Sequence, residues 1–135
     1  MNKRRNLYMK KTISNFELEN YIRILGAPES FKNNLAIKLP ASLVFGVRVN
    51  LKSMVDRYSV VEEMIKELRD EFVKDEKVEK DIVKHEYVDE WRTRYNEIMF
   101  QTSELDLTPI KKEDFENRDD LSWPELDILF WMTEE

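Results

Sequence analysis

The chain has 135 residues, a length that suits one compact domain, and its hydrophobic fraction of 41% is enough to fill a core. It contains no cysteine, which excludes disulfides, thiolate metal sites and a cysteine nucleophile, and its two glycines are too few for a glycine-rich phosphate loop. The net charge of −6 would repel a phosphate backbone, so direct nucleic-acid binding is not expected.

The charge is unevenly placed along the chain. Residues 1–11 carry five basic side chains and no acidic one, whereas residues 104–135 carry 11 acids against three bases. No hydrophobic stretch follows the basic start, as a secretory signal requires, and no apolar run reaches the roughly 20 residues that cross a bilayer. We therefore expect a soluble cytoplasmic protein, with residues 1–11 as a basic, flexible extension and residues 12–135 as a single helical domain.

A helix is predicted over residues 15–25. Ser14 and Glu17 have the spacing of a capping box, in which the serine hydroxyl accepts a hydrogen bond from the Glu17 N–H. Gly26 and Pro28 have the positions of residues that end a helix. The apolar residues of this segment recur at helical spacing and share one face: Leu18, Tyr21, Ile22 and Leu25.

Two short strands are predicted further along the chain. Hydrophobic residues alternate with other residues over residues 35–39, just before Pro40, and again over residues 104–108. Because neither segment has another obvious mate, we expect the two to pair as a minor two-stranded β-ribbon.

The strongest pattern predicts one uninterrupted helix over residues 44–72, with apolar residues at alternating spacings of three and four, as in a coiled-coil seam. Gly46 either weakens this helix or lets a neighbouring segment approach closely. The seam packs within its own chain or binds a partner. Leu51→Asp distinguishes these two possibilities. The substitution unfolds the chain if the seam packs within it, and it only blocks association if the seam binds a partner. The seam consists of Val44, Val47, Leu51, Met54, Tyr58, Val61, Ile65, Leu68 and Phe72.

A third helix is predicted over residues 77–101, with a looser apolar seam from Val78 to Ile98. The polar break at residues 74–77 has the length that joins antiparallel helices, so the two long helices are expected to form an antiparallel hairpin. Residues 111–120 are polar and are expected to form a loop or an irregular turn.

The end of the chain predicts a short terminal helix. Ser122 and Glu125 repeat the capping-box spacing, which places the start of the helix near Trp123. The aromatic residues Trp123, Phe130 and Trp131 either hold this helix on the domain or form an exposed anchor for a partner.

Little in the chain points to catalysis. Asp81 and Asp89 stand four residues to either side of His85, the only histidine, so on a helix the three would share one face and could hold a divalent metal. Acidic pairs such as Glu62 and Glu63 fit a solvated surface better than a buried acid–base pair. We expect no enzyme activity, no cofactor and no metal, and the alternative is a metal-dependent enzyme centred on His85.

Four stretches of the chain stand out: ISNFELENYIRIL, IKLPASLVFGVRVNLKSM, ELDLTPIKKEDF and LSWPELDILFWMTEE. These stretches, in this order, resemble those of a family of small uncharacterised phage and prophage proteins from Gram-positive bacteria. The resemblance implies a phage-type accessory protein in the cytoplasm of a host cell, and it supplies no catalytic motif.

We therefore predict a mainly α fold, with a long antiparallel helical hairpin, short N- and C-terminal helices and the minor β-ribbon. The predicted function is non-enzymatic: the protein binds another protein, either as an assembly accessory or as an inhibitor of a host system. The alternative within this class is an antitoxin-like acidic inhibitor of a basic nucleic-acid-binding protein. The expected partner is a host or phage protein, of basic character in that alternative, or a second copy of the chain. The predicted interaction residues are Val44, Val47, Leu51, Met54, Tyr58, Trp123, Phe130 and Trp131.

Overall fold

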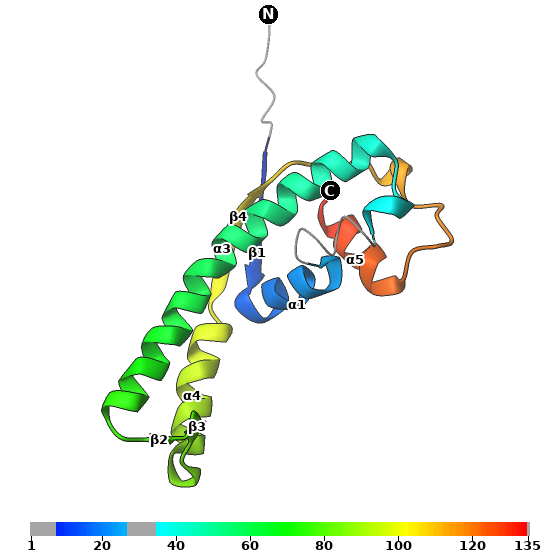
Figure 1. Ribbon diagram of the computed structural model, residues 1–135. Coiled ribbons are helices and arrows are strands. Elements are labelled where there is room, and N and C mark those ends of the chain that lie inside the picture. Colours follow the sequence, from blue (N-terminus) through cyan, green and yellow to red (C-terminus); the bar gives the residue numbers. More distant parts are fainter. Residues whose placement is uncertain (1–7, 27–34, 135) are drawn as a thin grey trace, which may run out of the picture.

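The computed structural model of the protein describes residues 8–26 and 35–134. These residues form a mainly helical structure with a small two-stranded antiparallel sheet (Figure 1), as the sequence predicts. Within them, no helix is both long enough and apolar enough to span a membrane. The α-helices are α1 (Asn15–Leu25), α3 (Ala41–Lys74), α4 (Val88–Met99) and α5 (Trp123–Trp131), and the strands are β1 (Met9–Ser14), β2 (Val78–Glu79), β3 (Ile82–Val83) and β4 (Thr102–Leu107). Short 3-10 helices cover Ala36–Lys38, His85–Tyr87 and Lys112–Asp114.

Helix α3 is a single helix of 34 residues that extends along most of the molecule (Figure 1). It contains the predicted helix over residues 44–72, which is confirmed. Gly46 lies where another segment comes close, because a Cβ atom at this position would be 3.1 Å from Ile110 Cγ2. The close-approach explanation of this glycine is therefore the one that the packing supports.

The buried side chains of α3 belong to two hydrophobic clusters. In its first half, Leu51 and Met54 pack in the main cluster, which also contains residues of α1, α5, β1 and β4. In its second half, Val61 and Phe72 pack in a second cluster with residues of α4. We call residues 58–74 together with β2, β3 and α4 the arm, because this part extends away from the main body (Figure 1).

Strand β4 confirms the strand predicted near residues 104–108, but the predicted pairing is wrong. β4 pairs with β1 in antiparallel register, over all six residues of each strand. Residues 35–39 instead contain a 3-10 turn, in which Leu35 and Leu39 are both buried. The turn covers Ala36–Lys38, and the two leucines flank it. Burial of both is compatible with this turn as well as with a strand, so the alternation of the sequence does not distinguish the two.

Strand β1 corrects the expectation that residues 1–11 form a flexible extension. Residues 9–11 belong to the strand, and residues 1–7 lie outside the described residues. The Lys10 ammonium lies on the exposed face of the ribbon, 3.1 Å from the Asp106 carboxylate. A basic segment can form a strand here because only one face of the ribbon packs on the core.

The third helix is shorter than predicted. Helix α4 begins at Val88, and the first part of the predicted span over residues 77–101 forms β2, β3 and a 3-10 turn. Glu76, just after α3, has a φ of 60°, and Lys80 and Asp81, between β2 and β3, have φ values of 53° and 65°. These left-handed residues are incompatible with a continuous helix. The second helix of the predicted hairpin therefore spans only 12 residues.

A double substitution in the β2–β3 turn is expected to stabilise the protein. Glu79 pairs with Ile82, so Lys80 and Asp81 form a two-residue loop in which both φ angles are positive. Such loops favour the sequence Asn-Gly, because other side chains are strained in the left-handed region. Lys80→Asn/Asp81→Gly should raise the free energy of unfolding by about 1 kcal/mol in urea denaturation. An unchanged or lower value would contradict this view of the turn.

Two buried asparagines join elements that are far apart in the sequence. Asn15 donates to the Ile98 carbonyl at 2.8 Å and accepts from the Ser103 hydroxyl at 2.7 Å, which ties the start of α1 to α4 and β4. Asn50 donates to the Thr108 carbonyl at 2.9 Å and accepts from the Thr108 N–H at 2.7 Å. Each amide therefore satisfies backbone or side-chain groups that burial would otherwise leave unpaired.

The predicted helix starts are confirmed at α1 and α5. The Ser14 hydroxyl accepts a hydrogen bond from the Glu17 N–H at 3.1 Å. At α5 the capping box is complete, since the Ser122 hydroxyl accepts from the Glu125 N–H and the Glu125 carboxylate accepts from the Ser122 N–H. These short-range signals locate both helices correctly within the fold.

Candidate functional site

Several predicted interaction residues lie inside the chain's own fold. Val47, Leu51 and Met54 are at most 1% exposed and belong to the main cluster. Val44 and Tyr58 are half-buried and pack against the same cluster. The prediction of a partner contact is wrong for the three buried residues, because other elements of the main cluster already cover them.

The outer side of α3 carries apolar residues that the predicted seam does not include. Phe45 is 72% exposed, and Val49, one turn later, is 37% exposed. Both border a hollow on the surface of the helix, whose floor includes the buried Leu51. We call this surface the α3 patch, and it consists of Phe45, Arg48, Val49, Lys52, Val55 and Asp56.

The α3 patch carries charged side chains of both signs beside its apolar residues. Arg48 and Lys52 carry positive charge against the single carboxylate of Asp56, which lies 3.6 Å from the Lys52 ammonium. That ion pair is mostly exposed and contributes little to stability. A second hollow, lined partly by residues 108–111, lies on the other side of Phe45. The Phe45 ring therefore stands between two hollows.

The C-terminal aromatic residues divide between the two predicted roles. Trp131 packs edge-to-face on Tyr21 of α1, with ring centroids 5.2 Å apart, and so holds α5 on the domain. Phe130 packs in the same way on Phe115 at 4.9 Å. Phe115 is buried, although the rest of its segment is polar, as the sequence indicates. Trp123 is 80% exposed and is the one of the three that a partner could reach most freely.

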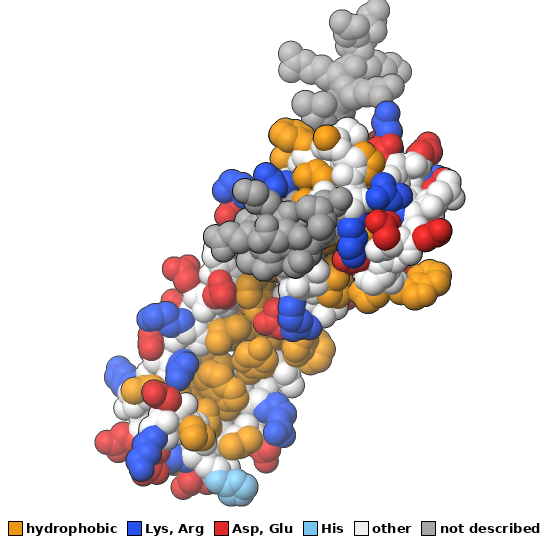
Figure 2. Space-filling model, turned by 45° about the vertical axis from the view of Figure 1, so that its right-hand side comes forward, with side chains coloured by type: hydrophobic (Ala, Val, Ile, Leu, Met, Phe, Trp, Pro, Cys, Tyr) orange, Lys and Arg blue, Asp and Glu red, His pale blue; other side chains and the backbone are white. Residues whose placement is uncertain are grey.

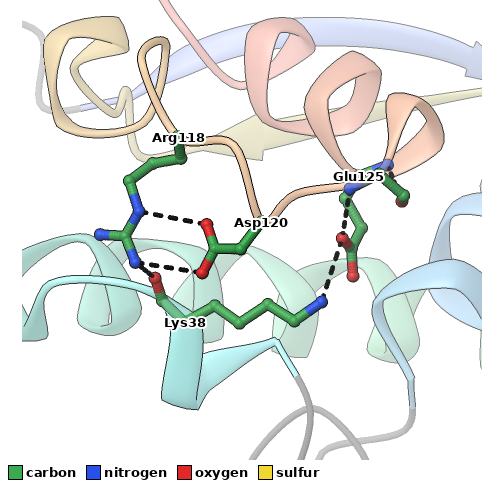
Figure 3. A network of polar contacts seen from close by, with 5 residues as sticks. Lys38, Arg118, Asp120 and Glu125 are labelled. Atoms are coloured by element: carbon green, nitrogen blue, oxygen red, sulfur yellow. Dashed lines mark hydrogen bonds and ion pairs between the residues drawn. The ribbon is translucent and has the colours of Figure 1, made fainter.

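A polar network joins the segment before α5 to the turn before α3 (Figure 3). The Arg118 guanidinium donates to the Lys38 carbonyl and, at 3.3 Å, to the Asp120 carboxylate. The Lys38 ammonium lies 3.7 Å from the Glu125 carboxylate, which also caps α5. The hydrogen bond from Arg118 holds the pKa of the Asp120 carboxyl below its usual value. Because these charges are used in contacts between segments, we interpret the network as structural.

The arm is less completely covered than the main body. Among the described residues, the main cluster has 17 buried and ten partly buried hydrophobic residues, whereas the arm cluster has five and nine. The 12 residues of α4 are too few to cover the second half of α3. Figure 2 shows hydrophobic side chains gathered in a band toward the end of the molecule that carries the histidine. Ile65, Val78, Val83 and Trp91 line a hollow on this side of the arm. We call this hollow, together with the partly buried Phe16, Tyr58 and Tyr95 of the same cluster, the arm groove.

Aromatic rings run along the arm groove in continuous contact. Phe72 meets Trp91 edge-to-face at 5.2 Å, and Trp91 stacks on Tyr95 at 6.2 Å. Phe16 of α1 then meets Tyr95 at 6.5 Å and Phe100 at 4.9 Å, both edge-to-face. Only Phe72 in this row is fully buried. The row therefore offers aromatic surface to solvent along the arm.

A hydrogen bond ties α3 to α1 at the end of the arm groove nearest the main body. The Tyr58 hydroxyl donates to the Glu19 carboxylate at 2.7 Å. Burial, followed by this hydrogen bond, raises the pKa of the Tyr58 phenol above its usual range. Burial and the Glu19 charge also raise the pKa of Tyr95. Both phenols therefore stay protonated at neutral pH and act as fixed, uncharged parts of the groove.

A separate hollow, between α3 and α4 in the arm, is lined mainly by acidic and apolar side chains. Arg94 donates two hydrogen bonds, of 2.9 and 3.1 Å, to the Glu71 carboxylate, and they lower the pKa of Glu71. Three carboxylates around one guanidinium leave the hollow with a net negative charge. We call it the acidic hollow, and its main lining residues are Met64, Glu67, Leu68, Glu71, Arg94, Glu97 and Ile98.

The three residues of the metal hypothesis do not share a helix. Asp81 lies in the β2–β3 turn, His85 begins a 3-10 turn, and only Asp89 belongs to α4. Asp81 is 3.8 Å from Arg69, and Asp89 is 3.5 Å from Arg92. In the part of the chain that the structure describes, no three histidine, cysteine or acidic side chains gather as a metal site needs. The metal hypothesis centred on His85 required the three residues to share one face of a helix, and the structure does not place them so.

The acidic pairs of the sequence lie in solvent. Glu62 and Glu63 are exposed on α3, and Asp119 and Asp120 are exposed before α5. An acid–base pair depends on burial to separate its two pKa values. None of these four carboxylates has that burial.

Comparison of the chain with family models, with curated proteins and with solved structures finds no match. The resemblance to phage and prophage proteins therefore stays a prediction. The candidate binding surfaces are therefore the α3 patch, the arm groove and the acidic hollow.

Proposed function

We propose that the protein is a non-enzymatic accessory protein of a phage or prophage, which binds another protein through the α3 patch in the cytoplasm of the host cell. The observation that carries this proposal is the exposed Phe45 ring between two hollows on a long helix. Apolar surface of this kind has no role in the chain's own core, and aromatic side chains are frequent anchors of protein interfaces. Such an anchor serves an assembly accessory and an inhibitor of a host system equally well.

The charges of the α3 patch indicate the chemistry of the partner. Arg48 and Lys52 border the apolar surface formed by Phe45, Val49 and Val55. A partner that places an apolar side chain in the hollow and polar groups beside its charged border would match both features.

Photo-crosslinking in the host cell tests the proposal. Val49 and Val73 are exposed valines of the same helix, so a photoreactive amino acid at position 73 is a matched control for one at position 49. We expect position 49 to cross-link one defined partner, identified by mass spectrometry, and position 73 not to capture that partner. Phe45→Ala should reduce the product from position 49 by about tenfold or more, since it removes the anchor.

Three outcomes of this experiment would contradict the proposal. One is equal yields at the two positions, which would indicate random collisions. Another is a product that survives Phe45→Ala. The third is a product that contains only the protein itself.

The acidic hollow supports a second candidate function, an antitoxin-like inhibitor of a basic nucleic-acid-binding protein. Glu67, Glu71 and Glu97 surround an apolar floor, which suits a segment with both basic and apolar side chains. The affinity of such a partner for the acidic hollow would fall steeply in moderate salt, because salt screens exposed charges. Binding at the α3 patch depends mainly on apolar burial and would persist. Salt dependence therefore distinguishes the two candidates once a partner is captured.

A further inference from the structure

We propose that the arm groove is covered by the arm groove of a second copy of the chain, so that two arms pack antiparallel around a twofold axis near Ile65. This surface is distinct from the α3 patch, and the proposal does not depend on the proposed function.

Other elements of the chain cover the second half of α3 incompletely. The predicted seam continues to Phe72, but α4 leaves Tyr58 and Ile65 only half-buried. Trp91 and Tyr95 add half-buried aromatic surface on the other side of the groove. An apolar strip of this kind between two helices is where a further helix packs in a bundle.

Helix α3 also carries two opposite charges on either side of Ile65. Glu62 precedes Ile65 by three residues and Arg69 follows it by four, so all three lie on one stripe of the helix. Glu62 and Arg69 are two turns apart, about 10 Å along the axis, with Ile65 near their midpoint. An antiparallel twofold axis near Ile65 therefore brings Glu62 of each protomer opposite the partner's Arg69, and both pairs form together.

The same charges explain why the occupant is a second copy. The edge of the groove carries both signs, and an antiparallel copy supplies the opposite sign at each position. A partner helix of uniformly basic or acidic character would leave Arg69 or Glu62 facing a like charge. The existing contact of Arg69 with Asp81, at 3.8 Å, is no obstacle, because both side chains are mostly exposed and such pairs are weak.

A charge swap tests the pairing in the full-length protein. Sedimentation equilibrium of the wild type should show a monomer–dimer equilibrium. Glu62→Lys and Arg69→Glu should each raise the dissociation constant by about tenfold, because each places like charges opposite one another at two symmetric positions. The double variant should return to within about threefold of the wild type. A wild type that stays monomeric at the highest soluble concentration would overturn the proposal, as would a double variant no better than the singles.

Single cysteines test the position of the axis, since the chain has none of its own. In Ile65→Cys the two thiols would lie close to the axis and should form an intermolecular disulfide under mild oxidation. Val60→Cys is the control, because Val60 is exposed on another side of α3. Cross-linking of Ile65→Cys that is no faster than that of Val60→Cys would overturn the proposed axis. Circular dichroism would verify that both variants keep the wild-type fold.

Discussion

Leu51→Asp is expected to unfold the protein. Leu51 is 1% exposed and lies in the main cluster, where its neighbours Val47 and Met54 on α3 are also buried. A carboxylate at this position would be buried among the apolar side chains of the main cluster, and burying a charge there costs several kcal/mol. Since a small domain is stable by only about 5–15 kcal/mol, most of the folded population should disappear. Circular dichroism should show the loss of helical signal at 25 °C.

Val49→Asp is the matched control for this experiment, because it places the same side chain two residues earlier on the same helix. Val49 is partly exposed, so its carboxylate would remain in water and the free energy of unfolding should change by less than about 0.5 kcal/mol. A Leu51→Asp protein that stays folded and loses only self-association would show that the seam packs between chains. The burial of Leu51 within its own chain indicates the opposite.

The parts of the fold that could be predicted are those determined by nearby residues. Ser122 and Glu125 locate the start of α5 because the capping box needs only four consecutive residues. The seam predicts α3 because apolar residues three and four apart must share one face of a helix. Such signals identify an element and its buried side without reference to the rest of the molecule.

The parts that could not be predicted depend on contacts between distant segments. The pairing of β1 with β4 joins residues 9–14 to residues 102–107, and no local pattern states which strand lies beside which. Leu35 and Leu39 fit a strand and a helical turn equally well, so only their packing decides. Val78 and Ile82 continue an apparently helical spacing, yet they belong to the two different strands of the β2–β3 hairpin. In each case tertiary packing selects one of two locally acceptable structures.

The candidate site shows the same division between local pattern and packing. The first half of the most regular apolar stripe became the core, so its buried residues Val47, Leu51 and Met54 were poor candidates for an interface. The useful signal was the opposite one: Phe45 and Val49 are large apolar residues that lie outside the stripe, one turn apart. An apolar residue that the seam does not require is a better indication of a docking surface than one that it does.

Phe72→Ala is expected to destabilise the arm by about 3–5 kcal/mol, the usual cost of truncating a buried phenylalanine. Phe72 is fully buried, and its ring contacts that of Trp91 at a centroid distance of 5.2 Å. The Lys77 ammonium also lies 5.1 Å from the centre of the ring, a contact that alanine cannot make. No other buried aromatic side chain supports the arm cluster among the described residues. Removing this one should therefore open the arm first.

Hydrogen exchange followed by mass spectrometry would locate the effect. The main cluster shares only Tyr58 with the arm cluster among the residues that the structure describes, so the two should respond separately. In Phe72→Ala, amides of α4 should lose protection while those of α1 and β4 keep it. Val73→Ala is the control, because Val73 is 54% exposed and its truncation should change stability by less than about 0.5 kcal/mol. An equal loss of protection in α1 and α4 would instead show that the two clusters unfold as one unit.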